Sequence, residues 1–294
     1  MKIIITGSLG NVAQPLAKHL VSEGHHITVI SSNESKKAEI EKLGARAAIG
    51  SIADPEFLIR TFEGADAVFL MTPPNMGKEN IVEHTINAGK NYAEAVKRTG
   101  IKKAVMLSSV GAGSAVENGQ IKGLHHIEKL YREVETAAFV FLRAGYFYVN
   151  FFNDIPLIKN AGILGANYPG NTEIPLVHPK DIAKAAAAEL LENSEGHTIK
   201  YIVSDFRPAS DFAQVFGNAI EKPGLPWVEF KDDEALNGML QAGVPDEMAE
   251  LYTEMGRGLR TGIVQKDFIE HGALVKGSTR LEDFSEEFAE VFNS

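Results

Sequence analysis

The sequence of 294 residues contains no cysteine and a single tryptophan. The missing cysteine excludes disulfide scaffolds, thiolate metal sites and cysteine nucleophiles. Nine histidines are present, but none has a familiar zinc-binding spacing with carboxylates, so we expect no metal site. No apolar run approaches membrane-spanning length, and the apolar run at residues 3–5 is too short for a signal-peptide core. These absences predict a soluble, cytoplasmic protein.

Positive charge is also scarce. Acidic residues outnumber lysine and arginine by 39 to 29, which gives a formal net charge of −10. Nucleic acids and acidic membranes attract clustered cations, so we expect neither as a direct partner. An anionic ligand therefore has to be held by local groups.

The first half of the sequence alternates short β-rich segments with segments that suit helices. Most of the predicted strands are continuous apolar runs, as expected for parallel strands that are covered on both faces. The strands are predicted at residues 2–6, 26–31, 46–49, 67–71, 103–108 and 139–143, and the helices at 12–23, 35–43, 56–62, 78–99 and 124–134. This alternation predicts an α/β fold built on a Rossmann-type, doubly wound parallel sheet.

The second half predicts a smaller, mainly helical cap. We assign residues 1–150 to the sheet domain and residues 151–294 to the cap, and residues 175–205 could return to the first domain. Glycine and proline predict a loop at residues 158–171, and Trp227 is assigned to a cap strand. Further helices are predicted at residues 179–192, 210–219, 232–242, 246–256 and 285–292.

The first predicted strand runs directly into a glycine turn and then into an amphipathic helix. Gly7 permits the tight turn, and Gly10 lets backbone N–H groups approach a pyrophosphate at the helix N-terminus. Ala13 takes the place of a third glycine. The order of strand, turn and helix predicts a dinucleotide site. The residues of this turn that we assign to the cofactor are Gly7, Ser8, Leu9, Gly10, Asn11 and Val12.

The end of the second strand bears on the choice between NAD and NADP. Ser31 stands where NAD-binding proteins carry an acidic residue for the adenine ribose. Without that charge a 2′-phosphate is not repelled, and Ser32, Asn33, Lys36 or Lys37 could contact one. We therefore favour NADP, although the carboxylate of Glu34 could still reach the ribose of NAD. Lys36 could equally belong to an ordinary solvated helix start.

Five segments together resemble one family, the NmrA-like atypical short-chain dehydrogenases/reductases, over almost the whole chain. The segments are Thr6-Gly7-x-x-Gly10, Phe69-Leu70-Met71-Thr72-Pro73-Pro74, Leu107-Ser108-Ser109-Val110-Gly111-Ala112, Leu142-Arg143-Ala144-Gly145-Tyr146-Phe147 with Asn150, and Val177-His178-Pro179-Lys180-Asp181-Ile182-Ala183. The family usually has proline where Ala144 stands. The resemblance implies an NAD(P)-binding Rossmann fold. It further implies that Met71, Thr72 and Pro73 border the cofactor ribose, that Ser108 and Ser109 lie beside the nicotinamide ribose, and that Gly145, Tyr146 and Phe147 wall the nicotinamide.

The usual catalytic motif of short-chain reductases is missing. In Tyr-x-x-x-Lys the lysine lowers the tyrosine pKa so that it can pass a proton, but no such motif follows Ser109. NmrA-like reductases often carry a lysine in the corresponding helix, where this chain has His125 and His126. These histidines and Tyr146 are our candidate catalytic residues, with Tyr148 as an alternative donor. Each could also be structural, the histidines on the surface and the tyrosines at a cap interface.

Three functions remain open. The leading hypothesis is an NAD(P)H-dependent reductase of a quinone-like or other small aromatic acceptor, which needs little acid catalysis. The second is a non-catalytic redox sensor that binds the cofactor and changes its contacts with a protein partner. The third, a nucleotide-sugar epimerase, normally relies on the missing tyrosine.

Overall fold

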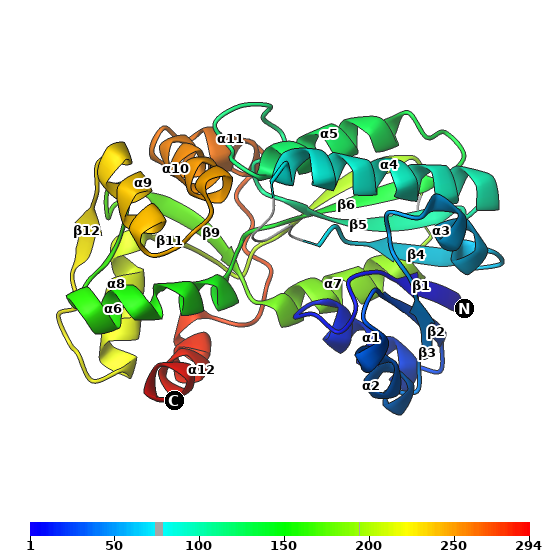
Figure 1. The fold of residues 1–294 in the computed structure, drawn as a ribbon, viewed down its shortest axis with the longest axis horizontal. Helices are drawn as coiled ribbons and strands as arrows, with labels where there is room; N and C mark the ends of the chain where they lie inside the picture. The colour runs from blue at the N-terminus through cyan, green and yellow to red at the C-terminus, as the bar shows by residue number, and fades with distance from the viewer. Residues whose placement is uncertain (74–78, 194) are drawn as a thin grey trace.

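The computed structural model describes residues 1–73, 79–193 and 195–294. Its main sheet has seven strands, all pairing in parallel, in the order β10-β6-β5-β4-β1-β2-β3 (Figure 1). The strands are β1 (Lys2–Ile5), β2 (His26–Ser31), β3 (Arg46–Ile49), β4 (Ala67–Leu70), β5 (Lys103–Ser109), β6 (Ala138–Ala144) and β10 (His197–Ile202). β4 and β6 are buried along their whole length, which explains their continuous apolar sequences. The Rossmann-type prediction is confirmed.

Helices cover both faces of this sheet (Figure 1). One layer consists of α1 (Ala13–Ser22), α2 (Lys37–Lys42) with the 3₁₀ helix η1 (Glu34–Lys36) before it, and α7 (Pro179–Leu191); the other consists of α3 (Pro55–Phe62), α4 (Ile81–Thr99) and α5 (Ile121–Arg132). Leu16 and Leu20 lie one turn apart on α1 and are fully buried, so the helix presents one apolar stripe to the sheet. α4 ends at Gly100, which adopts the left-handed conformation that glycine tolerates.

Two helices of the second layer begin elsewhere than the sequence predicts. α5 starts at Ile121, three residues early, and takes in Gly123. Glycine is needed there because a Cβ would lie 2.7 Å from Cγ2 of Thr85 on α4. α4 starts at Ile81, and Lys78, the first residue of the predicted helix, lies outside the described residues.

The cap has two small sheets and a layer of helices. Its strands are β7 (Tyr146–Phe147), β9 (Glu173–Val177) and β11 (Asp205–Pro208) in one sheet, and β8 (Leu164–Ala166) and β12 (Trp227–Glu229) in the other. Its helices are η2 (Tyr148–Asp154), α6 (Ile155–Ala161), α8 (Ala209–Ala219), α9 (Asp232–Gln241), α10 (Asp246–Arg260), α11 (Ile263–Glu270) and α12 (Leu281–Asn293). The predicted loop at 158–171 is wrong in part, because it contains the end of α6 and all of β8.

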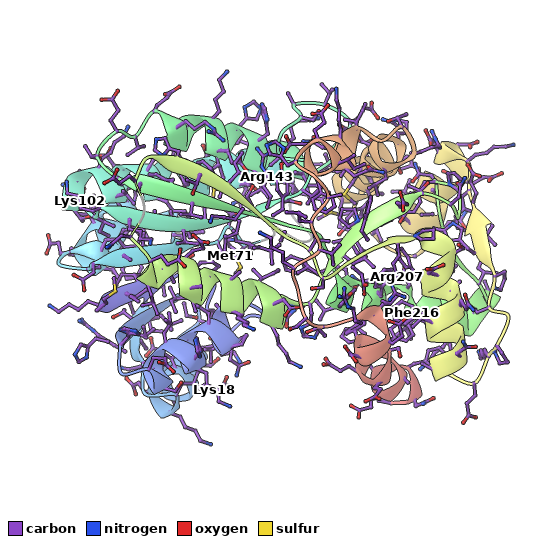
Figure 2. All side chains as sticks on the ribbon, turned by 180° about the vertical axis from the view of Figure 1, so that it is seen from behind. Lys18, Met71, Lys102, Arg143, Arg207 and Phe216 are labelled. Atoms are coloured by element: carbon purple, nitrogen blue, oxygen red, sulfur yellow. The ribbon has the colours of Figure 1, made fainter. Side chains whose placement is uncertain are left out.

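Aromatic side chains form the core of the cap. The ring of Phe216, labelled in Figure 2, stacks on Phe288 with centroids 4.2 Å apart, and both are fully buried. Trp227 lies in β12, as predicted. Among the residues that the structure describes, no helix has the length and apolar character that a membrane span requires.

The chain enters the cap and returns to the sheet. After β9 it forms α7, which packs on α1, and then β10, which pairs with β6 along its whole length. β10 and α7 therefore belong to the sheet side of the molecule. The carboxyl ends of the parallel strands point toward the cap, and the strand order reverses between β1 and β4.

Candidate functional site

The glycine turn after β1 requires glycine at its first position. Gly7 has φ +97°, and a Cβ there would overlap Cε of Met71. The buried hydroxyl of Thr6 accepts a hydrogen bond from the Met71 N–H at 2.7 Å. The turn is therefore anchored to the end of β4, where the strand order reverses.

The N-terminus of α1 offers free hydrogen-bond donors. The helix has no side-chain cap and no acidic residue in its first turn. Within the described parts of the chain, the N–H groups of Asn11 and Val12 donate to no protein acceptor. Among the residues that the structure describes, the Gly7 carbonyl alone lies within 4 Å of a Cβ placed on Gly10, so they leave the space in front of Gly10 open. Unpaired donors at the positive end of a helix dipole fit the pyrophosphate of a dinucleotide.

Ser31 closes the other side of the turn. Its buried hydroxyl accepts from the Ser8 hydroxyl at 2.9 Å and from the Asn33 N–H at 3.1 Å. This residue therefore holds the turn to the end of β2. Ser32 beside it is exposed. Lys36, which the sequence also suggests for the 2′-phosphate, is 3.0 Å from Glu39 in an exposed ion pair. Such a pair is weak enough for Lys36 to leave Glu39 and contact a phosphate instead.

The end of β4 approaches the turn from the other neighbouring strand. Met71, Thr72 and Pro73 are half-buried, whereas Pro74 lies outside the described residues. The Met71 carbonyl accepts hydrogen bonds from the Thr6 hydroxyl at 3.2 Å and from the Tyr92 hydroxyl at 3.0 Å. Burial raises the pKa of Tyr92. Its hydroxyl thus remains a neutral donor that positions this strand end.

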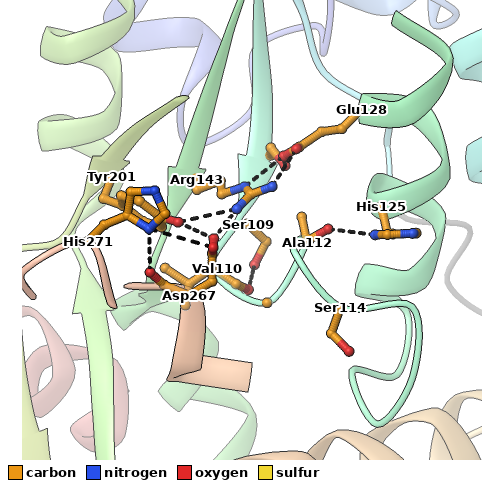
Figure 3. Close-up of polar contacts among 12 residues, drawn as sticks. Ser109, Val110, Ala112, Ser114, His125, Glu128, Arg143, Tyr201, Asp267 and His271 are labelled. Atoms are coloured by element: carbon orange, nitrogen blue, oxygen red, sulfur yellow. Dashed lines mark hydrogen bonds and ion pairs between the residues drawn. The ribbon is translucent and has the colours of Figure 1, made fainter. Parts of the chain in front are cut away.

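A buried ionic network supports the end of β5 (Figure 3). Ser108 donates to Oε1 of Glu128 at 2.6 Å, so its hydroxyl is committed to that carboxylate. Arg143 grips the same carboxylate with Nε at 3.0 Å and Nη2 at 2.6 Å, and both side chains are at most 5% exposed. Arg143 also donates to Asp267 on α11 and to the hydroxyl of Tyr201. In the sequence Arg143 stands in a predicted strand and in one of the five family-like segments, and the one available signal for its role was a cation inside an apolar run.

The two predicted histidines differ in their surroundings. Ser109 is half-buried, and its hydroxyl donates to the Val110 carbonyl at 2.8 Å. Nδ1 of His125 lies 2.8 Å from the Ala112 carbonyl, in the loop after β5 (Figure 3). His126 is exposed and meets His125 only through an edge-on ring contact with centroids 5.6 Å apart. The structure thus brings His125, and not His126, toward the loop that follows Ser109.

The tyrosines after β6 also differ from each other. Gly145 packs so closely on β9 that a Cβ would lie 2.7 Å from the Pro175 carbonyl oxygen. Tyr146 is half-buried, as is Phe147, which packs against the core beneath the sheet. Tyr148 is fully buried and donates to Asp205 at 2.7 Å. The suggestion that Tyr148 faces the site is wrong, because its hydroxyl is already bonded inside the cap.

Comparison with known proteins gives relatives of similar length. A (4-alkanoyl-5-oxo-2,5-dihydrofuran-3-yl)methyl phosphate reductase of Streptomyces griseus is 26% identical over 267 residues, which is 88% of each chain. An NAD(P)H azoreductase of Xenophilus azovorans is 23% identical and covers 86% of this chain and 85% of its own. Among solved structures, an NADPH-dependent quinone oxidoreductase of Escherichia coli in complex with NADPH has a TM-score of 0.83 at 18% identity, and covers 97% of this chain and 99% of its own.

The model of the NmrA-like family matches residues 1–257. This stretch includes the glycine turn, the strand ends described above and most of the cap. The resemblance inferred from the sequence motifs is confirmed, and the chain belongs to the NmrA-like family.

Proposed function

We propose that this chain is a cytoplasmic NADPH-dependent reductase of a small, flat aromatic acceptor, with quinones as the first class to test. The observation that carries the proposal is the glycine turn at Gly7, with its unpaired N–H groups at the start of α1. The turn stands where the strand order reverses, which is the position at which doubly wound sheets bind dinucleotides. Bound NADPH would supply the hydride.

The proposed contacts follow the carboxyl ends of the strands. The turn residues Gly7 to Val12 hold the pyrophosphate, and Ser32, Asn33 and Lys36 face the 2′-phosphate. Met71 to Pro73 and Ser109 border the nicotinamide ribose, while Gly145 to Phe147 flank the nicotinamide. Ser108 acts through Glu128 by fixing the end of β5. His125 is the better placed of the two histidines to contact the ribose or the acceptor.

The acceptor class is supported by the relatives. Three proteins similar to this chain are named as reductases, one of a quinone, one of azo compounds and one of a dihydrofuranone phosphate. Quinones and azo dyes are conjugated, electron-poor molecules that accept hydride readily. Such acceptors suit a site without Tyr-x-x-x-Lys, because they make small demands on an acid catalyst.

Stopped-flow loss of NADPH absorbance with a panel of quinones and azo dyes tests the activity. We expect turnover well above the buffer rate with at least one member. Tight NADPH binding without turnover of any member would defeat the reductase proposal and support a redox sensor. Calorimetry that detects no binding of either cofactor would contradict the site itself.

The preference for NADPH over NADH is tested by Ser31→Asp. A carboxylate at this position repels the 2′-phosphate and can bond the ribose hydroxyls, so we expect weaker NADPH binding and tighter NADH binding. Calorimetric titration of NADPH and of NADH into the unmodified chain and into Ser31→Asp measures this change in preference. Tighter binding of NADH than NADPH by the unmodified chain would contradict the proposed preference.

A further inference from the structure

Asp154 occupies the last position of the 3₁₀ helix η2, three residues after Phe151, which contacts Tyr146. In a 3₁₀ helix, side chains three residues apart lie on the same face, so Asp154 shares a face with Phe151. The ring of Phe151 meets Tyr146 with centroids 5.3 Å apart. Tyr146 follows Gly145 directly, at the carboxyl end of β6. Asp154 therefore lies on the face of η2 that contacts Tyr146, next to Gly145 in the segment proposed to flank the nicotinamide.

Two more tyrosines converge on this region from other elements. Asn167 donates to the Thr253 carbonyl at 2.9 Å, which joins the segment carrying Tyr168 to α10, the helix that carries Tyr252. At its start, α10 also contacts the sheet side, where a carboxylate oxygen of Glu247 accepts from the first N–H of α4 at 2.9 Å. Tyr252 thus lies on a helix that spans from the N-terminus of α4 to the cap.

A continuous set of ring contacts connects Tyr168 back to Tyr146. The ring of Tyr168 lies 5.4 Å from Trp227, which meets Phe212 at 6.0 Å. Phe212 meets Phe151 at 5.0 Å, and Phe151 meets Tyr146. These rings form one continuous series of contacts from Tyr168 to Tyr146 through the aromatic core of the cap.

The polar groups of Asp154 and of the three tyrosines have no partner among the described residues. Within the described residues, the hydroxyls of Tyr146, Tyr168 and Tyr252 and the carboxyl group of Asp154 make no hydrogen bond, although all four side chains are half-buried. Polar groups that are withdrawn from water are normally paired, so four partly withdrawn and uncommitted groups together suit a polar ligand. The four groups are also electrostatically coupled, because burial raises the pKa of each of the three tyrosines and the charge of Asp154 raises it further.

We infer that Asp154 is the proton donor of the reduction and that Tyr146, Tyr168 and Tyr252 bind the oxygen or nitrogen atoms of the acceptor around it. The inference rests on the proposed reductase function. The acceptor gains a hydride, with its two electrons, from NADPH, which leaves as NADP⁺. Its oxygen or nitrogen takes the proton of Asp154, whose O–H bond breaks, and solvent then returns a proton to the carboxylate.

The charge state of Asp154 matches this role near neutral pH. Burial alone raises its pKa to about 7, and no cation in the described part of the chain lowers it. The titratable groups that face it are the three tyrosines, from β7, from the segment after β8 and from α10. The donor is therefore protonated below about pH 7 and loses its proton above that value.

The pH dependence of kcat tests the inference in the full-length protein with saturating NADPH. For the unmodified chain we expect kcat to fall as the pH rises through about 7. Asp154→Asn should lower kcat about tenfold at pH 6, which is less than the usual effect of a general acid because these acceptors make small demands on one. It should also abolish this pH dependence while NADPH affinity is unchanged. Asp233→Asn makes the same chemical change at an exposed position on α9 and should behave like the unmodified chain.

The outcomes separate the two proposals. If the unmodified chain turns over and Asp154→Asn keeps its rate and its pH profile, Asp154 is not the donor and the reductase proposal stands. If the unmodified chain reduces no acceptor, the reductase proposal fails and the role of Asp154 fails with it. A ¹³C NMR titration of the aspartate carboxyl groups supplies a readout that does not need turnover. The unmodified chain should show one resonance that titrates near pH 7, and this resonance should be absent from Asp154→Asn. An unmodified chain without such a resonance would also overturn the inference.

Discussion

Glu128→Gln should cost the protein about 3 kcal/mol of stability. The change removes the charge that faces Arg143 while keeping the size of the side chain. Glu128 and Arg143 are 3% and 5% exposed, so water cannot replace the lost partner. Breaking a buried ion pair by removing one member costs about 3–5 kcal/mol. The lower end applies because the amide oxygen still accepts one hydrogen bond and Asp267 still faces the guanidinium.

Urea denaturation followed by circular dichroism measures this cost. With a denaturant slope of about 3 kcal/mol/M, the midpoint should fall by about 1 M. Glu56→Gln is the matched control, because Glu56 pairs with Arg98 at 2.6 Å but the two side chains are 60% and 48% exposed. Exposed pairs contribute at most about 1 kcal/mol, so the control midpoint should move by less than about 0.3 M. Equal shifts in the two variants would refute the argument that burial makes the Arg143 pair important.

Two further predictions concern the turn and the cap. Gly7→Ala should weaken NADPH binding about a hundredfold in calorimetry, because the new methyl group overlaps Met71. The control Gly24→Ala has a similar φ of +83° but open space around it, so it should bind NADPH normally. Equal affinities in both variants would contradict the proposed turn. Asp154→Asn should raise the melting temperature at pH 8 and leave it unchanged at pH 4. The folded pKa of about 7 exceeds the ordinary 3.8, so the unmodified chain alone loses stability, on the order of 4 kcal/mol, as the pH rises from the ordinary pKa to the folded pKa. A melting temperature of Asp154→Asn at or below that of the unmodified chain at pH 8 would show that the acid is well solvated.

The sheet was predictable because local sequence and tertiary environment agree. β4 and β6 are buried on both faces, so almost every residue is apolar and the period of the pattern did not have to be resolved. The glycine turn was predictable for a similar reason, since a tight turn before a helix restricts the residue at Gly7 directly. α6 was missed because it has only seven residues and is followed by a glycine-rich stretch that resembles a loop.

The polar groups of the site were harder to predict because their partners are distant in sequence. Arg143 meets Glu128 and Asp267 only after the sheet and α11 have assembled. Ser108 looked free for a cofactor because the acceptor of its hydroxyl lies on the next helix. Asp154 reads as an ordinary polar residue outside every predicted helix. The charge of Asp154 acts on Tyr252 of α10, which lies far along the chain, so no local pattern reports this relation.

The pairing of β10 with β6 has a consequence for the order of folding during synthesis. β6 carries the apolar residues Phe139, Phe141 and Leu142, and its outer edge is covered only when residues 197–202 arrive. Until then the ribosome has released a sheet with one unpaired, apolar edge, which is prone to associate with other chains. A chain cut at residue 150, although it would contain the whole glycine turn and six of the seven strands, should therefore aggregate. The minimal expressible nucleotide-binding fragment has to extend through β10, and so must carry the first part of the cap with it.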